Sequence, residues 1–228
     1  MIVSLEGVQG SGKSLSAVAM CHRDKRAGRH VFSNNHLSES FGDYEFFNTR
    51  YFLEKMNAEH GGDDDYDEDR DGGISLENAT LLMDEAYIYL DSRGSAGKLN
   101  KLFTYFVGQT RKRGVDMYVC THHIDVLDKR LRRAIDVRGS CRYIVEKPCR
   151  GCKGTGYIKK RGGRGLVIMC PRCLGYGHTG WAVTDFVHQF TGQRSRAIIQ
   201  GPAVWHLYDT RELVQIGKKS MTFRKGEI

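Results

Sequence analysis

Short apolar runs alternate with longer amphipathic segments along residues 1–145 of the chain. The runs hold few polar residues, which is typical of strands that are buried on both faces of a parallel sheet. We expect strands at residues 1–5, 30–33, 79–83, 116–121 and 140–145. We expect helices at residues 13–26, 50–56, 99–112 and 126–134. This alternation predicts an α/β fold with a mainly parallel sheet flanked by helices.

The pattern changes after residue 145, because the next segment is rich in glycine and carries four cysteines. Runs typical of strands resume at residues 181–187 and 196–200. The expected parts are a core at residues 1–145, a small inserted β-hairpin module at 146–180, and the last strands of the core with a polar tail at 181–228.

Charge is unevenly distributed along the chain, which has 35 Lys and Arg against 27 Asp and Glu and a net charge of +8. Residues 63–71 carry seven acids and one arginine, and glycine pairs bracket the wider segment 61–73, so we expect a mobile acidic loop there. Residues 101–172 hold 18 basic and 5 acidic side chains. A basic region of this density indicates a polyanionic partner, although a solvated surface would carry the same charge.

The composition excludes several classes of protein. With 40% hydrophobic and 27% charged residues, the chain is unlike a disordered protein and can form a real core. No stretch approaches the ~20 apolar residues of a spanning helix, and the N-terminus lacks the features of a signal peptide. We therefore expect a cytoplasmic protein without a transmembrane segment, whose seven cysteines are reduced.

Residues 7–14 (GVQGSGKS) match the phosphate-binding motif G-x-x-x-x-G-K-[ST] and lie between a predicted strand and a predicted helix. Glycines let the backbone curl so that its N–H groups converge on phosphate oxygens at the positive end of the helix. In such loops the lysine neutralises the β- and γ-phosphates and the serine offers its hydroxyl to Mg²⁺. We expect ATP to be bound by Gly7, Gly10, Ser11, Gly12, Lys13 and Ser14.

Two acids, Asp84 and Glu85, directly follow the apolar run at residues 79–83. In nucleotide hydrolases with this loop, the first such acid holds Mg²⁺ and the second polarises the attacking water. His122 directly follows the run at residues 116–121. Because the carboxyl ends of neighbouring parallel strands share one edge of the sheet, we expect His122 to sense the γ-phosphate. These positions predict ATP hydrolysis.

The order of these motifs resembles the zonular occludens toxin family, which includes assembly ATPases of filamentous phages and belongs to the FtsK/HerA superfamily of DNA-pumping ATPases. The resemblance covers residues 1–145, with a further likeness at residues 204–210. Besides the phosphate loop and the acidic strand end, it is carried by Ser33-Asn34-Asn35, Asp91-Ser92-Arg93 and the segment RKRGVD at residues 111–116.

The chain departs from this family at two points. Relatives often carry glutamine where this sequence has His122, and filamentous-phage members continue into a membrane-spanning segment that we do not find here. The resemblance therefore implies a DNA-translocating motor of the genome-packaging type, as in tailless viruses, that works in the host cytoplasm or with the virion. The alternative within the family is a phage assembly or extrusion ATPase.

The resemblance also implies a homo-oligomeric ring in which an arginine of one subunit completes its neighbour's active site. The candidates are Arg93, Arg111, Arg113 and Arg130, and we favour Arg113 because it precedes a strand that borders the nucleotide site. The basic residues 129–133 would face single- or double-stranded DNA and read its charge rather than its sequence. A capsid or membrane protein is a further expected partner.

Two C-x-x-C pairs, separated by 17 residues, predict a zinc site. The expected ligands are Cys149, Cys152, Cys170 and Cys173. The repeated C-x-x-C-x-G-x-G is similar to the cysteine-rich region of DnaJ chaperones, although free thiols or a redox pair are alternatives. We expect the basic tip of this hairpin, residues 159–164, to contact DNA or a neighbouring subunit, and the other three cysteines to be small core residues.

The sequence thus predicts a P-loop ATPase that uses ATP and Mg²⁺ to move DNA and that carries a Zn²⁺-held hairpin. A nucleotide or small-molecule kinase shares the phosphate loop but needs an acceptor pocket. A non-catalytic scaffold would use the zinc module and bind nucleotide only structurally. Stimulation of ATP consumption by DNA distinguishes the first function from the other two.

Overall fold

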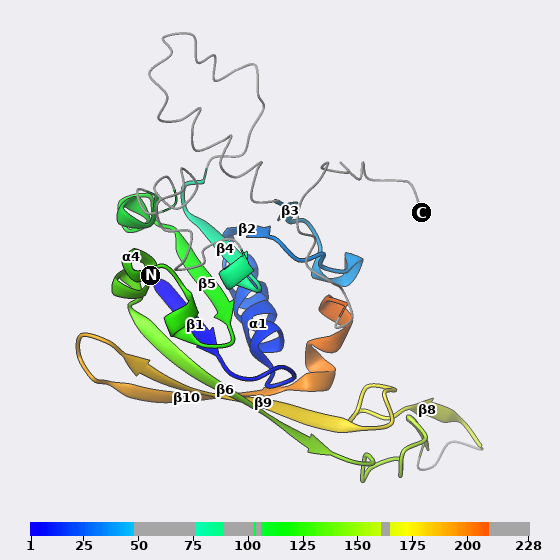
Figure 1. The fold of residues 1–228 in the computed structure, drawn as a ribbon. Coiled ribbons are helices and arrows are strands. Elements are labelled where there is room, and N and C mark those ends of the chain that lie inside the picture. Colours follow the sequence, from blue (N-terminus) through cyan, green and yellow to red (C-terminus); the bar gives the residue numbers. More distant parts are fainter. Residues whose placement is uncertain (48–75, 89–102, 104–105, 161–164, 210–228) are drawn as a thin grey trace.

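The computed structural model describes residues 1–47, 76–88, 103, 106–160 and 165–209. Its main feature is one eight-stranded sheet in the order β10-β9-β6-β1-β5-β4-β2-β3 (Figure 1). The strands of this sheet are β1 (Ile2–Glu6), β2 (His30–Ser33), β3 (Glu45–Phe46), β4 (Ala79–Met83), β5 (Asp116–Thr121), β6 (Val137–Glu146), β9 (Thr179–His188) and β10 (Arg194–Gln200). A separate two-stranded sheet holds β7 (Tyr157–Lys159) and β8 (Val167–Met169).

Helices and several short 3₁₀ turns connect these strands in the described part of the chain. The helices are α1 (Lys13–Arg26) and α4 (Lys129–Ala134). The 3₁₀ turns are η1 (Glu39–Phe41), η2 (Ala86–Ile88), η4 (Ile124–Val126), η5 (Gly201–Ala203) and η6 (Trp205–Leu207). Phe103 and residues 106–109 are also helical. No helix in the described ranges is long and apolar enough to cross a membrane.

The parallel part of the sheet confirms the predicted fold class. Strand β1 pairs in parallel with β5 on one side and β6 on the other, and β4 and β2 continue the sheet in the same direction. Every residue of β1 and β4 is buried, which explains why these strands appear in the sequence as uninterrupted apolar runs. Four predicted elements, β2, β4, β5 and α1, have the expected bounds.

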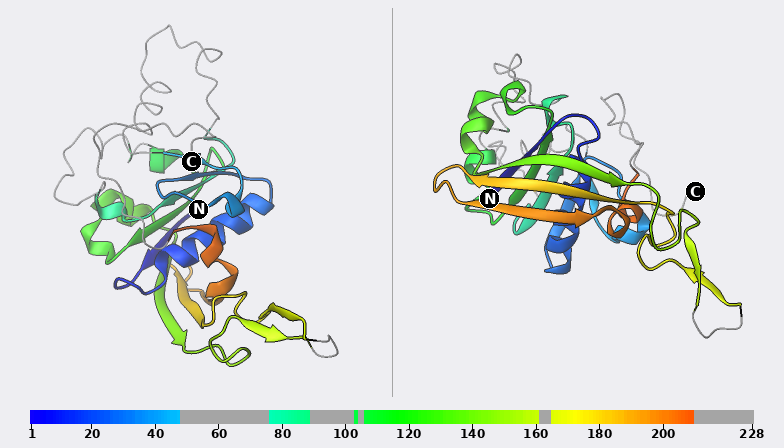
Figure 2. Two further views of the ribbon diagram at one scale, coloured as in Figure 1. Left: turned by 90° about the vertical axis from the view of Figure 1, so that its right-hand side faces the viewer. Right: turned by 90° about the horizontal axis from the view of Figure 1, so that it is seen from below.

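The other part of the sheet is a long antiparallel ribbon. Strand β6 pairs with β9 over ten residues, and β9 pairs with β10 over seven. All three strands begin before their predicted positions, because only their central residues form an apolar pattern. The ribbon extends past the parallel strands and carries the β7–β8 hairpin at its far end (Figures 1 and 2).

The two faces of the sheet bury separate hydrophobic clusters. One cluster packs α1, through Leu15 and Val18, against Leu5 and Tyr118 of the central strands. The cluster on the opposite face contains Phe106 and residues of β4, β5 and α4. The cysteines Cys21, Cys120 and Cys141 are buried free thiols, as expected. The core is therefore a three-layer α/β arrangement.

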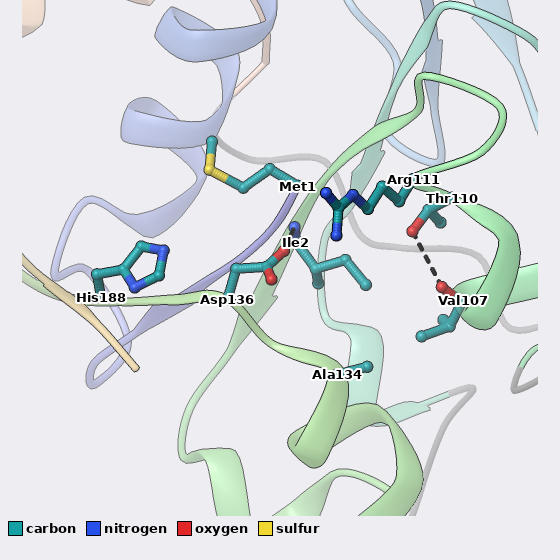
Figure 3. Close-up of a pocket in the computed structure, with 8 residues that line it drawn as sticks. All are labelled: Met1, Ile2, Val107, Thr110, Arg111, Ala134, Asp136 and His188. Carbon is teal, nitrogen blue, oxygen red and sulfur yellow. Dashed lines mark hydrogen bonds between the residues drawn. The ribbon is translucent and has the colours of Figure 1, made fainter. Parts of the chain in front are cut away.

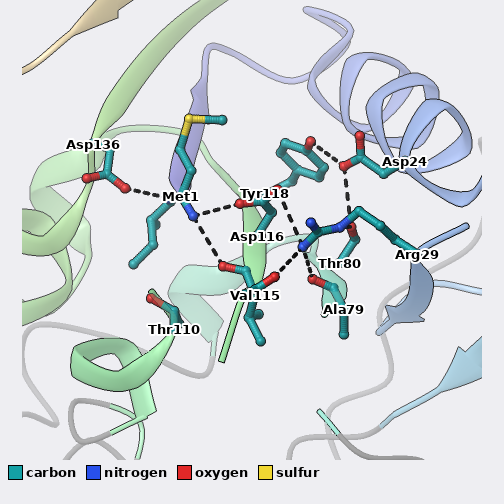
Figure 4. Close-up of polar contacts among 12 residues, drawn as sticks. Met1, Asp24, Arg29, Ala79, Thr80, Thr110, Val115, Asp116, Tyr118 and Asp136 are labelled. Carbon is teal, nitrogen blue, oxygen red and sulfur yellow. Dashed lines mark hydrogen bonds and ion pairs between the residues drawn. The ribbon is translucent and has the colours of Figure 1, made fainter. Parts of the chain in front are cut away.

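Polar contacts fix the amino ends of the strands (Figure 4). The Met1 ammonium donates to Asp116 Oδ1 at 2.7 Å, and the Tyr118 hydroxyl donates to Asp24 at 2.6 Å. Burial, followed by the hydrogen bond to Asp24, raises the pKa of Tyr118. Arg29 donates to the carbonyl oxygens of Ala79 and Gly114, each at 2.6 Å. Ion pairs and hydrogen bonds thus stabilise the amino ends of the strands, whereas the phosphate loop follows the carboxyl end of β1.

Several expectations fall on residues outside the described ranges. They are the helix at 50–56, the acidic loop at 61–73, Arg93, much of the helix at 99–112, and residues 161–164 of the hairpin tip. Of the last predicted helix, at 126–134, only Val126 belongs to η4, and the α-helix begins at Lys129, because Asp128 Oδ1 accepts from the amide of Arg130.

Candidate functional site

The phosphate loop connects β1 to α1 with glycines in backbone conformations that other residues rarely adopt. Gly7 and Gly12 have φ values of 152° and 86°. A Cβ on Gly7 would lie 2.5 Å from Ser11 Oγ, and one on Gly12 would lie 3.0 Å from Ala182 Cβ. Glycine is therefore required both by backbone conformation and by close packing of the loop against β9.

The interior of this loop offers hydrogen-bond donors. Lys13 is 6% exposed, and its ammonium donates to the carbonyl oxygens of Gly7 and Val8 at 3.0 and 3.1 Å. No side chain caps the 14-residue helix α1 at Gly12, and its first turn has no acid. Helix N–H groups and a positive charge thus face the same loop, an arrangement that binds phosphate.

Asp84 lies directly opposite Ser14, because β4 ends beside the start of α1. Ser14 donates through Oγ to Asp84 Oδ2 at 2.6 Å, and Asp84 is only 5% exposed. A hydroxyl and a carboxylate are hard oxygen ligands, which suit Mg²⁺. The structure therefore brings together the two residues that the sequence assigned to magnesium, and their donor set fits that ion.

Two asparagines that sequence reasoning did not assign to the site hold Asp84 in place. Asn35 Nδ2 donates to Asp84 Oδ2 at 2.7 Å. Asn34 accepts from the Asp84 amide at 2.7 Å and donates to its carbonyl oxygen at 2.8 Å. Both side chains are buried. The signal in the sequence was the polar pair directly after the strand at residues 30–33, which places them at the ligand-binding edge of the sheet.

Glu85 and His122 meet at the carboxyl ends of the neighbouring strands β4 and β5. His122 Nε2 lies 3.7 Å from Glu85 Oε2, and Glu85 has a left-handed backbone with φ of 48°. The ring of Tyr87 lies 5.4 Å from that of His122. Burial, followed by its hydrogen bond to Glu85, raises the pKa of Tyr87. Tyr87 is thus a further member of this cluster that the sequence did not indicate.

A second tyrosine reaches the site from the end of the described chain. Tyr208 follows η6 and forms a β-bridge with Leu37. Burial, followed by the nearby Asp84 carboxylate, raises the pKa of Tyr208. Tyr208 therefore lies near Asp84, and its bridge to Leu37 places it beside the end of β2.

Two of the candidate arginines, Arg111 and Arg113, lie at the opposite edge of the sheet. Arg113 precedes β5 and lies at its amino end, where its carbonyl oxygen accepts from Asn78 and its Nε donates to Gln109 at 3.3 Å. Arg111 lines a cavity of about 430 Å³ at the same edge, near the N-terminus (Figure 3). This is the edge opposite the phosphate loop, so Arg113 lies away from the nucleotide-binding motif of its own chain, and a role in a neighbouring subunit is the one that we predicted for it. That role remains a prediction.

The basic helix α4 presents its charges outward. Leu131 is buried, whereas Lys129, Arg130 and Arg133 are exposed. Arg132 is instead paired with Asp125, at 2.9 Å. Part of the predicted basic band is therefore available to a polyanion.

The four predicted zinc ligands form one buried cluster. Their sulfur atoms all lie within 4.8 Å of one another, with Cys149 and Cys170 at 3.9 Å and Cys152 and Cys173 at 3.6 Å. Tetrahedral zinc with Zn–S bonds of about 2.3 Å requires S···S separations of about 3.8 Å. The cluster therefore fits Zn²⁺, and the separations are far too long for disulfides.

Backbone amides support this cluster from outside. Gly156 N–H donates to Cys152 Sγ at 3.2 Å, and Gly177 N–H donates to Cys173 Sγ at 3.3 Å. Burial opposes ionisation of Cys152, but amide hydrogen bonds, first that of Gly156, lower its pKa to about 6. The two repeats also pair, with Cys149 N–H donating to the Gly177 carbonyl oxygen at 2.8 Å. Burial, despite the Gly177 amide, raises the pKa of Cys173 to about 11, so the contacts favour the thiolate, the form that binds metal, at Cys152 and not at Cys173.

Comparison with known proteins places this geometry in a family. A family model described as zonular occludens toxin (Zot) matches residues 1–145, more than half of the chain. The chain belongs to the zonular occludens toxin family. The family match includes the phosphate loop, both acids and His122, and the Zot resemblance inferred from the motifs is thereby confirmed. No curated protein sequence matches this Zot-family chain.

Solved structures share the fold of this Zot-family chain at low sequence identity. The N-terminal domain of zonular occludens toxin from Neisseria meningitidis is 16% identical, with a TM-score of 0.52, over 91% of this chain and 98% of that domain. The genome packaging NTPase B204 from Sulfolobus turreted icosahedral virus 2, in complex with AMPPCP, is also 16% identical, with a TM-score of 0.50, over 86% of this chain and 95% of that one. The shared feature is the fold of a nucleotide-binding ATPase.

Proposed function

We propose that this Zot-family protein hydrolyses ATP to move DNA, as a genome-packaging ATPase. The observation that carries this proposal is the convergence of Lys13, the Ser14–Asp84 pair and the Glu85–His122 pair at one edge of the sheet. The fold similarity to a genome packaging NTPase and to a Zot domain supports it. The chain would act in the host cytoplasm, where viral particles are filled.

The phosphate loop would hold the nucleotide. On binding, the Lys13 ammonium would exchange the carbonyl oxygens of Gly7 and Val8 for phosphate oxygens, which the amides at the start of α1 also bind. Ser14 and Asp84 would hold Mg²⁺, which neutralises charge that develops on the phosphates. Asn35 keeps the Asp84 carboxylate oriented toward Ser14.

Glu85 would act as the general base that takes a proton from the attacking water. Its carboxylate lies at the free edge of the sheet, next to His122 and Tyr87. His122 would contact the γ-phosphate and report its loss to β5, because it directly follows that strand. An arginine of the adjacent subunit, for which Arg113 is our first choice, would complete the site in a homo-oligomeric ring.

DNA would be bound by the exposed basic residues of α4 and of the β7–β8 hairpin, where Lys159 and Lys160 are exposed. Contacts of this kind neutralise backbone phosphates, so affinity should be independent of sequence and fall steeply with salt. Zn²⁺ bound by the four cysteines would hold the hairpin together, because that module buries few other side chains.

Family membership also favours a second function, in which the same ATPase drives assembly or extrusion of a phage through a capsid or membrane-protein partner. Both functions require the same hydrolytic site. They differ in the effector, because a packaging motor responds to DNA and an extrusion motor responds to its protein partner.

Glu85→Gln tests the hydrolytic step. The change removes the base but keeps the shape of the side chain, so AMPPCP binding should persist while ATP turnover falls by roughly 100-fold or more. Glu77→Gln, an exposed acid before the other end of β4, is the matched control and should retain full turnover. Full activity of Glu85→Gln would refute the assignment of Glu85 as the base.

A further inference from the structure

The cysteine module is attached to the core through aromatic contacts as well as through the chain. Tyr176, three residues after Cys173, meets the Trp205 ring edge-on at 5.0 Å, and His178 lies over Trp205 at 4.8 Å. Gln200 of β10 also donates to the Arg172 carbonyl oxygen at 3.0 Å. The cysteine module, residues 146–180, thus contacts η6 and the end of β10. These contacts lie where the β6–β9 ribbon continues into the module (Figure 2).

Trp205 in turn contacts residues that form a wall of the phosphate loop. Tyr143 and Trp205 both pack against the hydrophobic cluster that contains Ala182 and Leu207. Burial raises the pKa of Tyr143, and its hydrogen bond with Trp205 opposes this rise. The Tyr143 ring is pressed against Gly180 and also lies next to Gly12, where a Cβ would be 3.5 Å from its Cδ2. Ala182 completes this wall at 3.0 Å from the same position. The backbone of Tyr176, whose amide donates to the Cys173 carbonyl oxygen at 3.0 Å, and then the packed side chains of Tyr176, Trp205 and Tyr143 therefore join the cysteine cluster to the start of α1.

The segment at residues 205–208, on which the cysteine module packs, also reaches the side of the site that holds Asp84. Leu207 and Tyr208 follow Trp205 directly, and Leu207 accepts from the amide of Ser38 at 2.9 Å. Tyr208 pairs with Leu37, two residues after Asn35. A shift of Trp205 would therefore be felt at both the phosphate loop and the Asp84 side.

The module has few other contacts that would keep its shape without metal. Its buried cluster consists of the four cysteines with Ile158 packed against them. Several side chains of the β7–β8 hairpin, such as Tyr157 and Val167, are more than half exposed. Loss of the metal should therefore unfold the module and release Tyr176 and His178 from Trp205.

We propose that Zn²⁺ at the four-cysteine cluster and nucleotide at the phosphate loop bind cooperatively, through Tyr176, His178, Trp205 and Tyr143. Zinc holds Trp205 against Tyr143 and so preorganises the wall behind Gly12. Nucleotide binding to the zinc-free protein has to order this wall first, which lowers affinity. Linkage requires the reverse effect too, so nucleotide must tighten zinc binding by the same factor. This inference rests on the proposed zinc and nucleotide sites.

The test measures AMPPCP affinity of the full chain by titration calorimetry, with and without Zn²⁺, at fixed Mg²⁺. A zinc-selective chelator removes the metal, and thiolate-to-Co²⁺ absorbance reports whether the four-cysteine site can be filled. Removal of zinc should weaken AMPPCP binding by about fivefold or more, within the usual range of coupling between sites. AMPPCP should strengthen Zn²⁺ binding by the same factor.

Variants separate the coupling from the two sites themselves. Trp205→Ala, and the milder double change Tyr176→Ala/His178→Ala, should still bind Zn²⁺ but should show the weaker, zinc-free AMPPCP affinity whether or not zinc is bound. Tyr157→Ala is the matched control, because this exposed tyrosine lies in the same module, and it should retain the zinc effect.

Each failure has its own signature. If Co²⁺ fills the four-cysteine site and AMPPCP affinity is nevertheless the same with and without bound metal, the coupling is refuted, although both binding sites are confirmed. Absence of Co²⁺–thiolate absorbance would refute the metal site and the coupling with it. Absence of AMPPCP binding in every metal state would refute the proposed nucleotide function.

Discussion

At the scale of single residues, the site depends on how one carboxylate is held. Asp84 Oδ2 accepts from both Ser14 and Asn35, and Asn34 fixes the Asp84 backbone with two further hydrogen bonds. The sequence could identify Asp84 and Ser14 because their motifs follow directly from phosphate chemistry. It could not assign the asparagines, because their role depends on β2 lying next to β4 in the sheet, and sheet order is not written in local spacing.

Asn35→Ala should raise the Mg²⁺ concentration that gives half-maximal ATP turnover by about tenfold, because outer residues that orient a metal ligand typically contribute this much. Binding of nucleotide in the absence of Mg²⁺ should be unchanged, since Asn35 contacts Asp84 and not the phosphate loop. Turnover measured against Mg²⁺ concentration checks this. An unaltered Mg²⁺ dependence would show that Asn35 does not position Asp84.

At the scale of elements, helix α1 and the ribbon of β6 and β9 form one unit. Gly12 packs on Ala182, and Ser16 hydrogen-bonds Thr184 at 3.0 Å. The sequence predicted the elements of the parallel sheet closely because their residues are buried on both faces and give uninterrupted apolar runs. The ribbon strands were predicted too short, because residues at their starts, such as Arg194 and Ser195 of β10, are polar and exposed and give no apolar pattern.

Substitutions at the two ends of α1 test this packing. Gly12 and Gly28 have nearly the same φ, 86° and 87°, but a Cβ on Gly28 would meet nothing within 4 Å. Gly28→Ala should therefore cost only backbone strain, about 1 kcal/mol in urea unfolding. Gly12→Ala adds a close contact with Ala182 and should weaken AMPPCP binding far more than Gly28→Ala does. Equal AMPPCP affinities of the two variants would contradict this role for the loop's packing against β9.

At the scale of the whole molecule, the candidate nucleotide site, the candidate arginines and the cysteine module lie in different places. The nucleotide site lies at the carboxyl edge of the parallel strands, Arg111 and Arg113 lie at the amino edge, and the cysteine module projects from the end of the ribbon (Figures 1 and 2). The sequence suggested that an arginine acts on the site of a neighbouring subunit. Only the fold shows that Arg113 lies at the end of the sheet opposite its own chain's phosphate loop.

ATP hydrolysis measured with and without double-stranded DNA, with parallel sizing of the assembly, tests the central claim most directly. We predict that DNA of any sequence increases ATP turnover several-fold and that this increase disappears as the salt concentration is raised. The stimulated protein should be a homo-oligomer with a mass that fits a closed ring. Single-stranded DNA in a second series determines which form of DNA is the substrate. ATP turnover that neither form of DNA changes at low salt, in an assembled protein, would contradict the account.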